Sequence, residues 1–326
     1  MKKLLAVLLL LALLTGCTTN TPAPETAPAP TAPTTSTSPS SAPITQHTQS
    51  GTIPDATVAT LPEEEGLTVH FIDVGQADCA LIECDGEYML IDAGYYENGI
   101  DVVEYLFDLG VEELDLMVGT HPHGDHIGGL PVVLDYFDTE RIWFSAMPYT
   151  NGTVSTFLSA ARRHDVEVEQ PQVGDTYQLG SALVTMLGPV KTDYEDVNDI
   201  SLVLRVDYGD TRFLFTGDME AIAETDLLDS GADVKADVLK VGHHGSYSST
   251  SYRFLREVAP TYAVISCGAG NEYGHPHDEP MSRLRDAEVI IYRTDRMYDI
   301  VAFSDGEEIT FTWGNAYAKP WTPNAA

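Results

Sequence analysis

Four residues that could bind a metal ion stand within six positions of one another, directly after an apolar segment. They are His121, His123, Asp125 and His126. The preceding segment LDLMVGT has the pattern of a buried strand, and imidazole and carboxylate groups are the usual ligands of zinc and related divalent ions. This density at one strand end predicts a metal site. A chance histidine-rich loop is the alternative, which the strand, loop and helix context disfavours.

Later segments offer further polar side chains at the ends of apolar strands. Asp218 follows TRFLFTG and precedes a helix, so it could face the same opening or act as an ordinary N-cap. The pair His243 and His244 follows another buried strand, and we expect one ligand and one residue that faces substrate; a structural role for one of them is the alternative. His275, after YAVIS, is a candidate ligand or proton donor, and His277 ranks below it.

Polar residues near these segments could support the site. Asp78, in DVGQADCALI, and Asp92, in LIDAG, stand at ends of apolar strands, where a buried carboxylate needs a partner. We expect one of them to orient a ligating histidine, with a turn-forming role as the alternative for Asp92. Ser246, with Ser248 and Ser249, offers a hydroxyl to a phosphate oxygen or to the N-terminus of the following helix.

The segment THPHGDHIGG matches the HxHxDH signature of the metallo-β-lactamase superfamily at every defined position, and the chain resembles that superfamily. Five further blocks, in order, resemble the branch with the nuclease-like domain of the DNA-uptake channel ComEC. They are FIDVGQADCALI, LIDAG, NDISLVLRVDYGDTRFLFTGD, ADVLKVGHHGSYSSTS and NEYGHPH. The resemblance implies an α/β fold, the αββα four-layer sandwich, with a metal site at the sheet ends between the two halves.

The resemblance also implies how the ligands divide. His121 and His123 match ligands of a first metal, Asp125 and His126 match ligands of a second, and Asp218 matches the carboxylate that bridges both. We expect Zn²⁺ or Mn²⁺, as one or two ions, with His243 as a further ligand.

The chain departs from the superfamily pattern between the first motif and Asp218, where the usual histidine has no clear counterpart. His164 is the histidine in that interval, and its surroundings ARRHDVEVE are typical of a solvated helix end. The matching block is instead VNDISLVL, which puts Asn198 or Asp199 near the site.

A bound divalent ion lowers the pKa of water to about 7, so the expected chemistry is hydrolysis. We expect Asp125, His244 and His275 to take part in catalysis, with either histidine protonating the leaving group. A phosphodiester or related phosphoester is favoured, in a small molecule, a cell-wall polymer or extracellular DNA. β-Lactam hydrolysis is less favoured. An inactive, metal-stabilised surface binding module is the alternative from another class, and the missing histidine supports it.

The elements that must position these residues follow from the hydrophobic pattern of residues 66–314, which we expect to form one domain. Strands are predicted at 67–74, 79–84, 87–93, 114–120, 182–187, 201–209, 211–217, 236–242, 262–266 and 288–294. Amphipathic helices are predicted at 99–109, from 128, and at 156–164, 220–228, 249–257 and 280–285. Strand pairs at both ends with helices between strands in the middle indicate two sheets.

The N-terminal residues predict export and a lipid anchor. Residues 1–16 have two lysines and a short apolar run, typical of a signal peptide, and Leu14 to Cys17 resembles the lipobox of bacterial lipoproteins. Residues 17–65 comprise the lipidated cysteine and a Thr-, Pro-, Ala- and Ser-rich tether, and residues 315–326 form a tail. We therefore expect an extracytoplasmic protein that is held at the membrane by lipid alone, and no protein partner is evident.

The chain carries 50 acidic against 17 basic residues, a formal net charge of −33. This charge opposes tight binding of nucleic acid and favours solubility outside the cell. Cys79, Cys84 and Cys267 remain after Cys17 is assigned to lipid, and an odd number argues against a disulfide framework.

Overall fold

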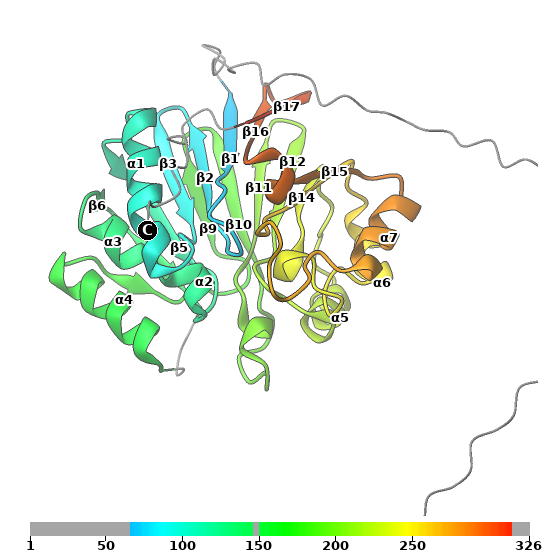
Figure 1. The fold of residues 1–326 in the computed structure, drawn as a ribbon, viewed down its shortest axis with the longest axis horizontal. Coiled ribbons are helices and arrows are strands. Elements are labelled where there is room, and N and C mark those ends of the chain that lie inside the picture. Colours follow the sequence, from blue (N-terminus) through cyan, green and yellow to red (C-terminus); the bar gives the residue numbers. More distant parts are fainter. Residues whose placement is uncertain (1–65, 146–149, 315–326) are drawn as a thin grey trace, which may run out of the picture. The chain divides into compact units, whose positions relative to one another are not determined.

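Two β-sheets lie face to face with helices on both outer sides (Figure 1). The computed structural model describes residues 66–145 and 150–314 of the 326. The predicted export signal, Cys17, the predicted tether and the predicted C-terminal tail lie outside these residues. Within the described part, none of the helices combines the length and apolar character that crossing a bilayer requires.

The first sheet has eight strands in the order β17-β16-β1-β2-β3-β5-β7-β8. Their bounds are β1 Leu67–Phe71, β2 Ala80–Cys84, β3 Glu87–Ile91, β5 Leu116–Gly119, β7 Ile142–Phe144, β8 Val168–Glu169, β16 Asp299–Ser304 and β17 Ile309–Gly314. The pairs from β17 to β3 are antiparallel, and those from β3 to β8 are parallel. A two-stranded sheet pairs β4 (Glu113–Leu114) with β6 (Asp138–Thr139).

The second sheet has seven strands in the order β15-β14-β13-β12-β11-β10-β9. Their bounds are β9 Thr176–Leu179, β10 Ala182–Gly188, β11 Val203–Tyr208, β12 Thr211–Phe215, β13 Val238–Lys240, β14 Tyr262–Ile265 and β15 Ile290–Arg293. Strands β12 to β15 are parallel, so their carboxyl ends meet at one edge of the sheet. Helices are needed between these strands because a parallel neighbour requires a crossover.

The helices cover the outer faces of the two sheets. Helices α1, α3 and α4 pack on the first sheet, and α5, α6 and α7 on the second (Figure 1). Their bounds are α1 Gly99–Leu109, α2 Gly124–Ile127, α3 Leu130–Leu134, α4 Gly152–Arg163, α5 Ala221–Asp229, α6 Tyr252–Val258, α7 Asp278–Asp286 and α8 Thr294–Met297, with 3₁₀ turns η1 Tyr96–Asn98, η2 Val197–Ile200 and η3 Gly242–Gly245.

Alternating side chains of the strands build two different apolar layers. In β3, Met89 and Ile91 face the layer between the sheets, whereas Leu90 faces the helices. Phe71 of β1 stacks on Phe215 of β12 across the inner layer, with ring centroids 6.0 Å apart. The result is helix, sheet, sheet, helix, so the predicted αββα sandwich is confirmed.

Several sequence expectations about local structure are refined. Helix α6 begins at Tyr252 and not at 249, because the Ser251 side chain accepts a hydrogen bond from Phe254 N as its N-cap. Cys79, Cys84 and Cys267 are free and buried, as the odd count predicted. His164 contacts Asp135 at the surface, 2.7 Å away, with its side chain 33% exposed.

Replacing Asp299 with Asn should stabilise the protein at neutral pH. Burial, together with nearby Asp73, raises the pKa of Asp299 to about 6, so its stabilising effect is complete below about pH 4 and disappears as pH rises through 6. The Asn variant should gain about 2 kcal/mol near pH 7.5 and little at pH 4. Urea unfolding at both values checks this; an equal effect at both would contradict it. Asp305→Asn is the control. Backbone N–H groups lower the pKa of Asp305, so the change in stability of this variant near pH 7.5 should have the opposite sign.

Candidate metal centre

The polar residues singled out in the sequence meet at the carboxyl ends of parallel strands. Strand β5 ends at Gly119 and leads into the HPHGDH loop and α2, β12 leads to Asp218, and β13 leads to η3 with its two histidines. In α/β folds such strand ends are where loops from different strands converge on a ligand. The two sheets therefore bring residues from 78 to 275 into one region.

The HPHGDH loop is held against the loop after β3 by close backbone contacts. A side chain on Gly129 would place its Cβ 2.1 Å from the Ala93 carbonyl oxygen, and one on Gly128 would place its Cβ 2.7 Å from the Tyr96 backbone nitrogen. Glycine is required at these two positions because larger residues would separate the loops. Gly124 has no such restriction, since its nearest neighbour is a carbon of the Tyr95 ring at 3.7 Å.

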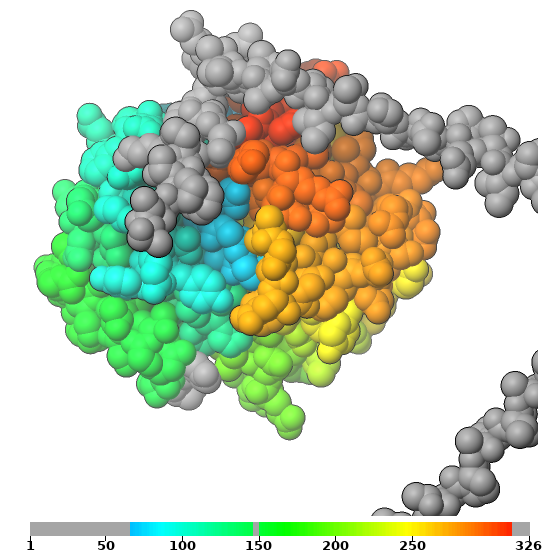
Figure 2. All heavy atoms as spheres, viewed as in Figure 1, coloured from blue at the N-terminus to red at the C-terminus, as the bar shows by residue number. Residues whose placement is uncertain are grey.

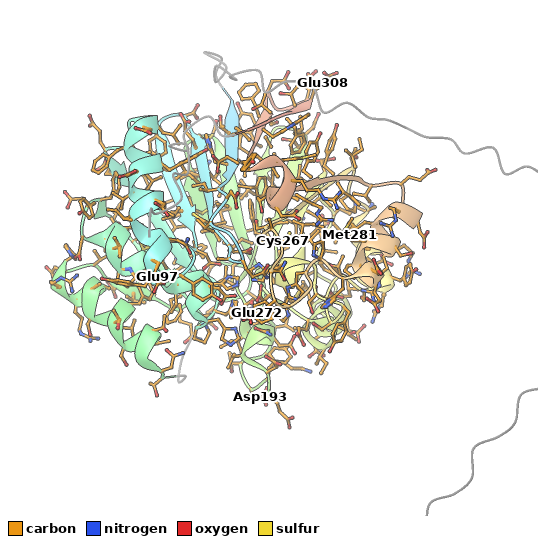
Figure 3. The ribbon with its side chains drawn as sticks, in the orientation of Figure 1. Glu97, Asp193, Cys267, Glu272, Met281 and Glu308 are labelled. Carbon is orange, nitrogen blue, oxygen red and sulfur yellow. The ribbon has the colours of Figure 1, made fainter. Side chains whose placement is uncertain are left out.

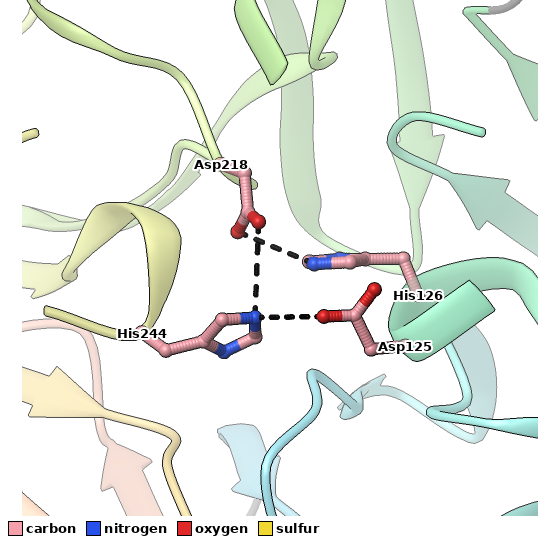
Figure 4. Close-up of side chains that lie close together, drawn as sticks. All are labelled: Asp125, His126, Asp218 and His244. Atoms are coloured by element: carbon pink, nitrogen blue, oxygen red, sulfur yellow. Dashed lines mark ion pairs between the residues drawn. The ribbon is translucent and has the colours of Figure 1, made fainter. Parts of the chain in front are cut away.

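Four side chains form a first group of potential ligands: Asp125, His126, Asp218 and His244 (Figure 4). His126 Nε2 lies 3.2 Å from Asp218 Oδ1. His244 Nε2 lies 3.4 Å from Asp125 Oδ2 and 3.7 Å from Asp218 Oδ2. Nitrogen and oxygen ligands of one tetrahedral zinc ion are about 3.3 Å apart, so this spacing suits a shared cation.

A second group shares Asp218 with the first and adds His121 and His123. His121 Nε2 lies 3.0 Å from His123 Nδ1 and 3.8 Å from Asp218 Oδ2. His121 and Asp218 are buried, whereas His123 lines the pocket described below. Asp218 is therefore the residue that the two groups share.

Three buried atoms of the first group have no hydrogen-bond partner. They are His126 Nε2, Asp218 Oδ1 and His244 Nε2. Unpaired polar atoms in a protein interior are costly, and native structures rarely leave several of them pointing at one another. A divalent cation would satisfy all three at once, so these residues fit a metal ion.

Asp92 orients His126 from behind. Its Oδ2 accepts a hydrogen bond from His126 Nδ1 at 2.8 Å, and the Thr120 hydroxyl and backbone N–H also donate to the carboxylate. The proton on Nδ1 leaves the Nε2 lone pair for the group of potential ligands. Asp92 also has a positive φ of 57°, so the turn-forming interpretation holds beside the orienting one.

Asp78 performs the same task for His244, with help from a buried lysine. His244 Nδ1 donates to the Ser266 carbonyl and lies 3.1 Å from Asp78 Oδ1. The other carboxylate oxygen accepts from Lys240 Nζ at 2.7 Å. Lys240, Asp78 and His244 are 4%, 6% and 1% exposed, so the positive charge of Lys240 is confined to this interaction and to the Val241 carbonyl.

His243 and His244 diverge because both have left-handed backbone angles, with φ of 49° and 52°. His244 is buried in the group with Asp125, His126 and Asp218, whereas the His243 side chain is 24% exposed in the pocket. Glu220 Oε1 accepts from His243 Nδ1 at 2.9 Å and from the Ser248 hydroxyl at 2.7 Å. His243 Nε2 lies 3.7 Å from Asp218 Oδ2.

Asn198 and Ser246 are buried beside this Glu220 and not at the pocket surface. Asn198 Nδ2 donates to Glu220 Oε1 at 3.5 Å, and the Ser246 hydroxyl contacts that of Ser248 at 2.8 Å. Their observed contacts therefore support Glu220 and, through it, His243. Asp199 accepts a hydrogen bond from the Glu220 backbone N–H.

A pocket of about 350 Å³ opens over the site. Besides the site residues, its lining includes Gln76, Tyr95 and Tyr273. His275 faces it with its ring 6.2 Å from that of His244, and its Nδ1 lies 3.1 Å from Gln76 Nε2. Burial, aided by His244 and His243, lowers the pKa of His275 to about 4, so it is neutral at pH 7.

The carboxylates give the cluster a negative potential. Burial alone would lower the pKa of His244, but Asp218 and Asp78 raise it to about 10. The pKa of His126 is likewise raised well above its usual value by Asp218 and Asp92, against the effect of burial. Burial would raise the pKa of Asp218, yet the two histidines hold it well below its usual range. A potential that favours protons here also favours a metal cation, which competes for the same lone pairs.

Sequence reasoning missed five residues of the site: Gln76, Tyr95, Glu220, Lys240 and Tyr273. Lys240 left a signal, because it is the one charged residue in the apolar run VLKVG, where a charge requires a buried partner. Glu220 stands two residues after Asp218, but nothing local shows that it meets His243. Tyr95 and Gln76 stand in loops whose contacts depend on how the two halves pack.

A family model described as Metallo-beta-lactamase superfamily matches residues 72–269. ComE operon protein 3 of Bacillus subtilis (strain 168) is 31% identical over 246 residues, covering 70% of this chain and 32% of that protein. Competence protein ComA of Neisseria gonorrhoeae is 31% identical over 237 residues, covering 72% and 32%. The chain therefore spans about a third of the length of these curated relatives.

Among solved structures, the metallo-beta-lactamase fold protein YhfI from Bacillus subtilis superposes with a TM-score of 0.51. The match covers 73% of this chain and 100% of YhfI, at 14% sequence identity. At this level of identity the likeness concerns the fold alone.

Proposed function

The chain belongs to the metallo-β-lactamase superfamily, and we propose that it is an extracytoplasmic, metal-dependent phosphodiesterase. The observation that supports this most is Asp218, which is buried between two groups of metal-type side chains and has an unpaired oxygen facing one of them. A shared carboxylate of this kind suits two neighbouring cations better than a structural ion.

His121, His123 and Asp218 would hold one divalent ion, and Asp125, His126, Asp218 and His244 would hold another, of the Zn²⁺ or Mn²⁺ type. When bound, such ions supply an ionised water at neutral pH and polarise the scissile bond. In this assignment His244 is a ligand, because its free Nε2 points to Asp125 and Asp218.

The chain's own residues supply orientation and a proton. Asp92 and Asp78 fix the ring positions of His126 and His244 from behind. His243 is the histidine best placed to protonate a leaving group, because Glu220 holds its Nδ1 while its ring faces the pocket. His275 is half-buried and neutral, which suits contact with substrate or a ligand better than proton donation.

The preference for a phosphoester rests on two supports. The five sequence blocks resemble a nuclease-like domain, and two cations about one carboxylate can stabilise the attacking and leaving oxygens of a phosphoryl group. The extracytoplasmic location and the lipid anchor are proposed from residues 1–17. Palmitate labelling of Cys17 tests the anchor.

The proposal is tested by assaying the purified chain on bis(p-nitrophenyl) phosphate after chelation and again after adding Zn²⁺ or Mn²⁺. We expect hydrolysis that depends on the added ion. Nitrocefin, assayed in parallel, tests the β-lactam alternative. Binding of the ion without cleavage of either ester or lactam, in a folded protein, would favour the inactive binding module instead.

A further inference from the structure

The pocket over the site has aromatic walls that come from both halves of the protein. Tyr95 follows β3 and precedes η1, and Tyr273 stands in the loop between β14 and α7. Both side chains line the same pocket, so the two halves meet beside the site. They are 38% and 54% exposed, so their rings remain accessible to a ligand.

Both rings are supported from behind. The ring of Tyr273 stacks on that of His275, with centroids 5.7 Å apart and an angle of 27°. Tyr95 lies against Gly124 of the HPHGDH loop, where a Cβ would be 3.7 Å from its ring. The loop that carries Tyr273 is itself anchored, because Gln76 accepts from the Gly268 N–H and its amide contacts His275.

Figure 2 shows the segment before α7 lying directly against the segment after β1, in agreement with these contacts. Glu272 stands near the centre of the view in Figure 3, on the same loop. Because the loop is anchored and the Tyr273 ring packs against His275, this surface is preorganised. A planar group can therefore stack on it with little further ordering.

No lysine or arginine is among the described residues that line the pocket. Lys240 lies nearby, but it is buried and committed to Asp78. The charges near the aromatic walls are acidic: burial, together with Asp125 and Glu272, raises the pKa of Tyr95. A polyanionic strand needs a track of cations along its phosphates. The acidic charges at this entrance would instead repel such a strand.

We infer that the pocket takes a small phosphoester with a planar ring next to the scissile phosphate, of the chemistry of a single nucleotide, and not a long strand or a ring-free wall polymer. This inference rests on the proposed function for the position of the phosphate at the metal-type groups. The volume of about 350 Å³ suits one such unit. Tyr95 and Tyr273 are the specificity residues, since stacking on a tyrosine recognises the ring and tolerates its identity.

The test uses two diesters with the same ring-free leaving group, trifluoroethanol: trifluoroethyl thymidine 5′-phosphate and trifluoroethyl ethyl phosphate. The full chain, loaded with Zn²⁺ or Mn²⁺, should prefer the nucleoside ester by about 10-fold or more in kcat/KM. Tyr95→Leu and Tyr273→Leu should each reduce that ratio several-fold. Tyr247→Leu is the control, because Tyr247 is 63% exposed and packs on His277 outside the pocket lining.

Binding provides a second measurement that does not need turnover. Thymidine 5′-monophosphate, titrated calorimetrically, should bind the wild type about 10-fold more tightly than either pocket variant and equally to the control. Equal cleavage of both diesters by the wild type would overturn the ring inference and leave the hydrolase intact. A kcat/KM that rises about 10-fold from a thymidine dimer to a 20-mer would overturn the restriction to small substrates. If neither diester is cleaved, the proposed function fails, and the binding comparison alone then decides about the ring.

Discussion

Replacing Asp218 with Asn should reduce kcat/KM for a phosphodiester by about 10³-fold or more, and it should weaken the binding of both metal ions together. Loss of a partner that merely orients a ligand already costs about 10- to 100-fold, and Asp218 contacts both groups directly. Asn keeps the volume and one oxygen, but it loses the negative charge and presents an N–H₂ to one side. Calorimetric titration with Mn²⁺ should show both binding steps weakened.

The control for this prediction is Asp193→Asn, which removes the same charge from an exposed loop at the edge of the molecule (Figure 3). It should leave activity and metal binding unchanged. Unfolding curves in the presence of chelator separate a local effect from loss of the fold. If Asp218→Asn removed one ion and left the other at wild-type affinity, Asp218 would be a ligand of a single ion and not a bridge.

The layers of the fold were predictable because burial on both sides of a strand leaves a strong sequence pattern. Strands such as β5 and β14, with the sequences LMVG and YAVI, are continuous apolar runs, as parallel strands covered by helices require. The short strand β7 and the outer strand β17 were not predicted. β7 has three residues, and the side chains of β17 are largely exposed, so neither has a hydrophobic period long enough to recognise.

The HPHGDH loop was predictable as a unit because its four candidate ligands are close in sequence. The different positions of the His243 and His244 side chains were not predictable. They depend on two left-handed backbone conformations that the residue types do not indicate. Glu220 and Tyr273 could not be assigned for another reason. Their roles arise from contacts between segments more than 20 residues apart in the chain, and no local period reports such contacts.

Replacing Lys240 with Met should destabilise the protein by about 3–5 kcal/mol, because it leaves the Asp78 carboxylate buried without its cation. Burial alone would raise the pKa of Asp78, and Lys240 and His244 hold it below its usual value. We therefore expect Asp78→Asn, introduced into the Lys240→Met variant, to restore a substantial part of the lost stability. Urea unfolding of the two single variants and the double variant gives the coupling energy.

The matched control is Lys191→Met, since Lys191 Nζ also lies 2.7 Å from a carboxylate, that of Asp226, but with its side chain 54% exposed. An exposed ion pair contributes about 0–1 kcal/mol. Because the two pairs have equal N–O distances and differ in burial, the difference between the two variants measures the effect of desolvation. Lys240→Met should also weaken one metal-binding step about 10- to 100-fold, because Asp78 faces His244 and not the His121 group. If Lys240→Met kept wild-type stability, water would have to reach the Asp78 carboxylate. If both metal-binding steps were weakened equally, Lys240 would act on the whole site and not through His244.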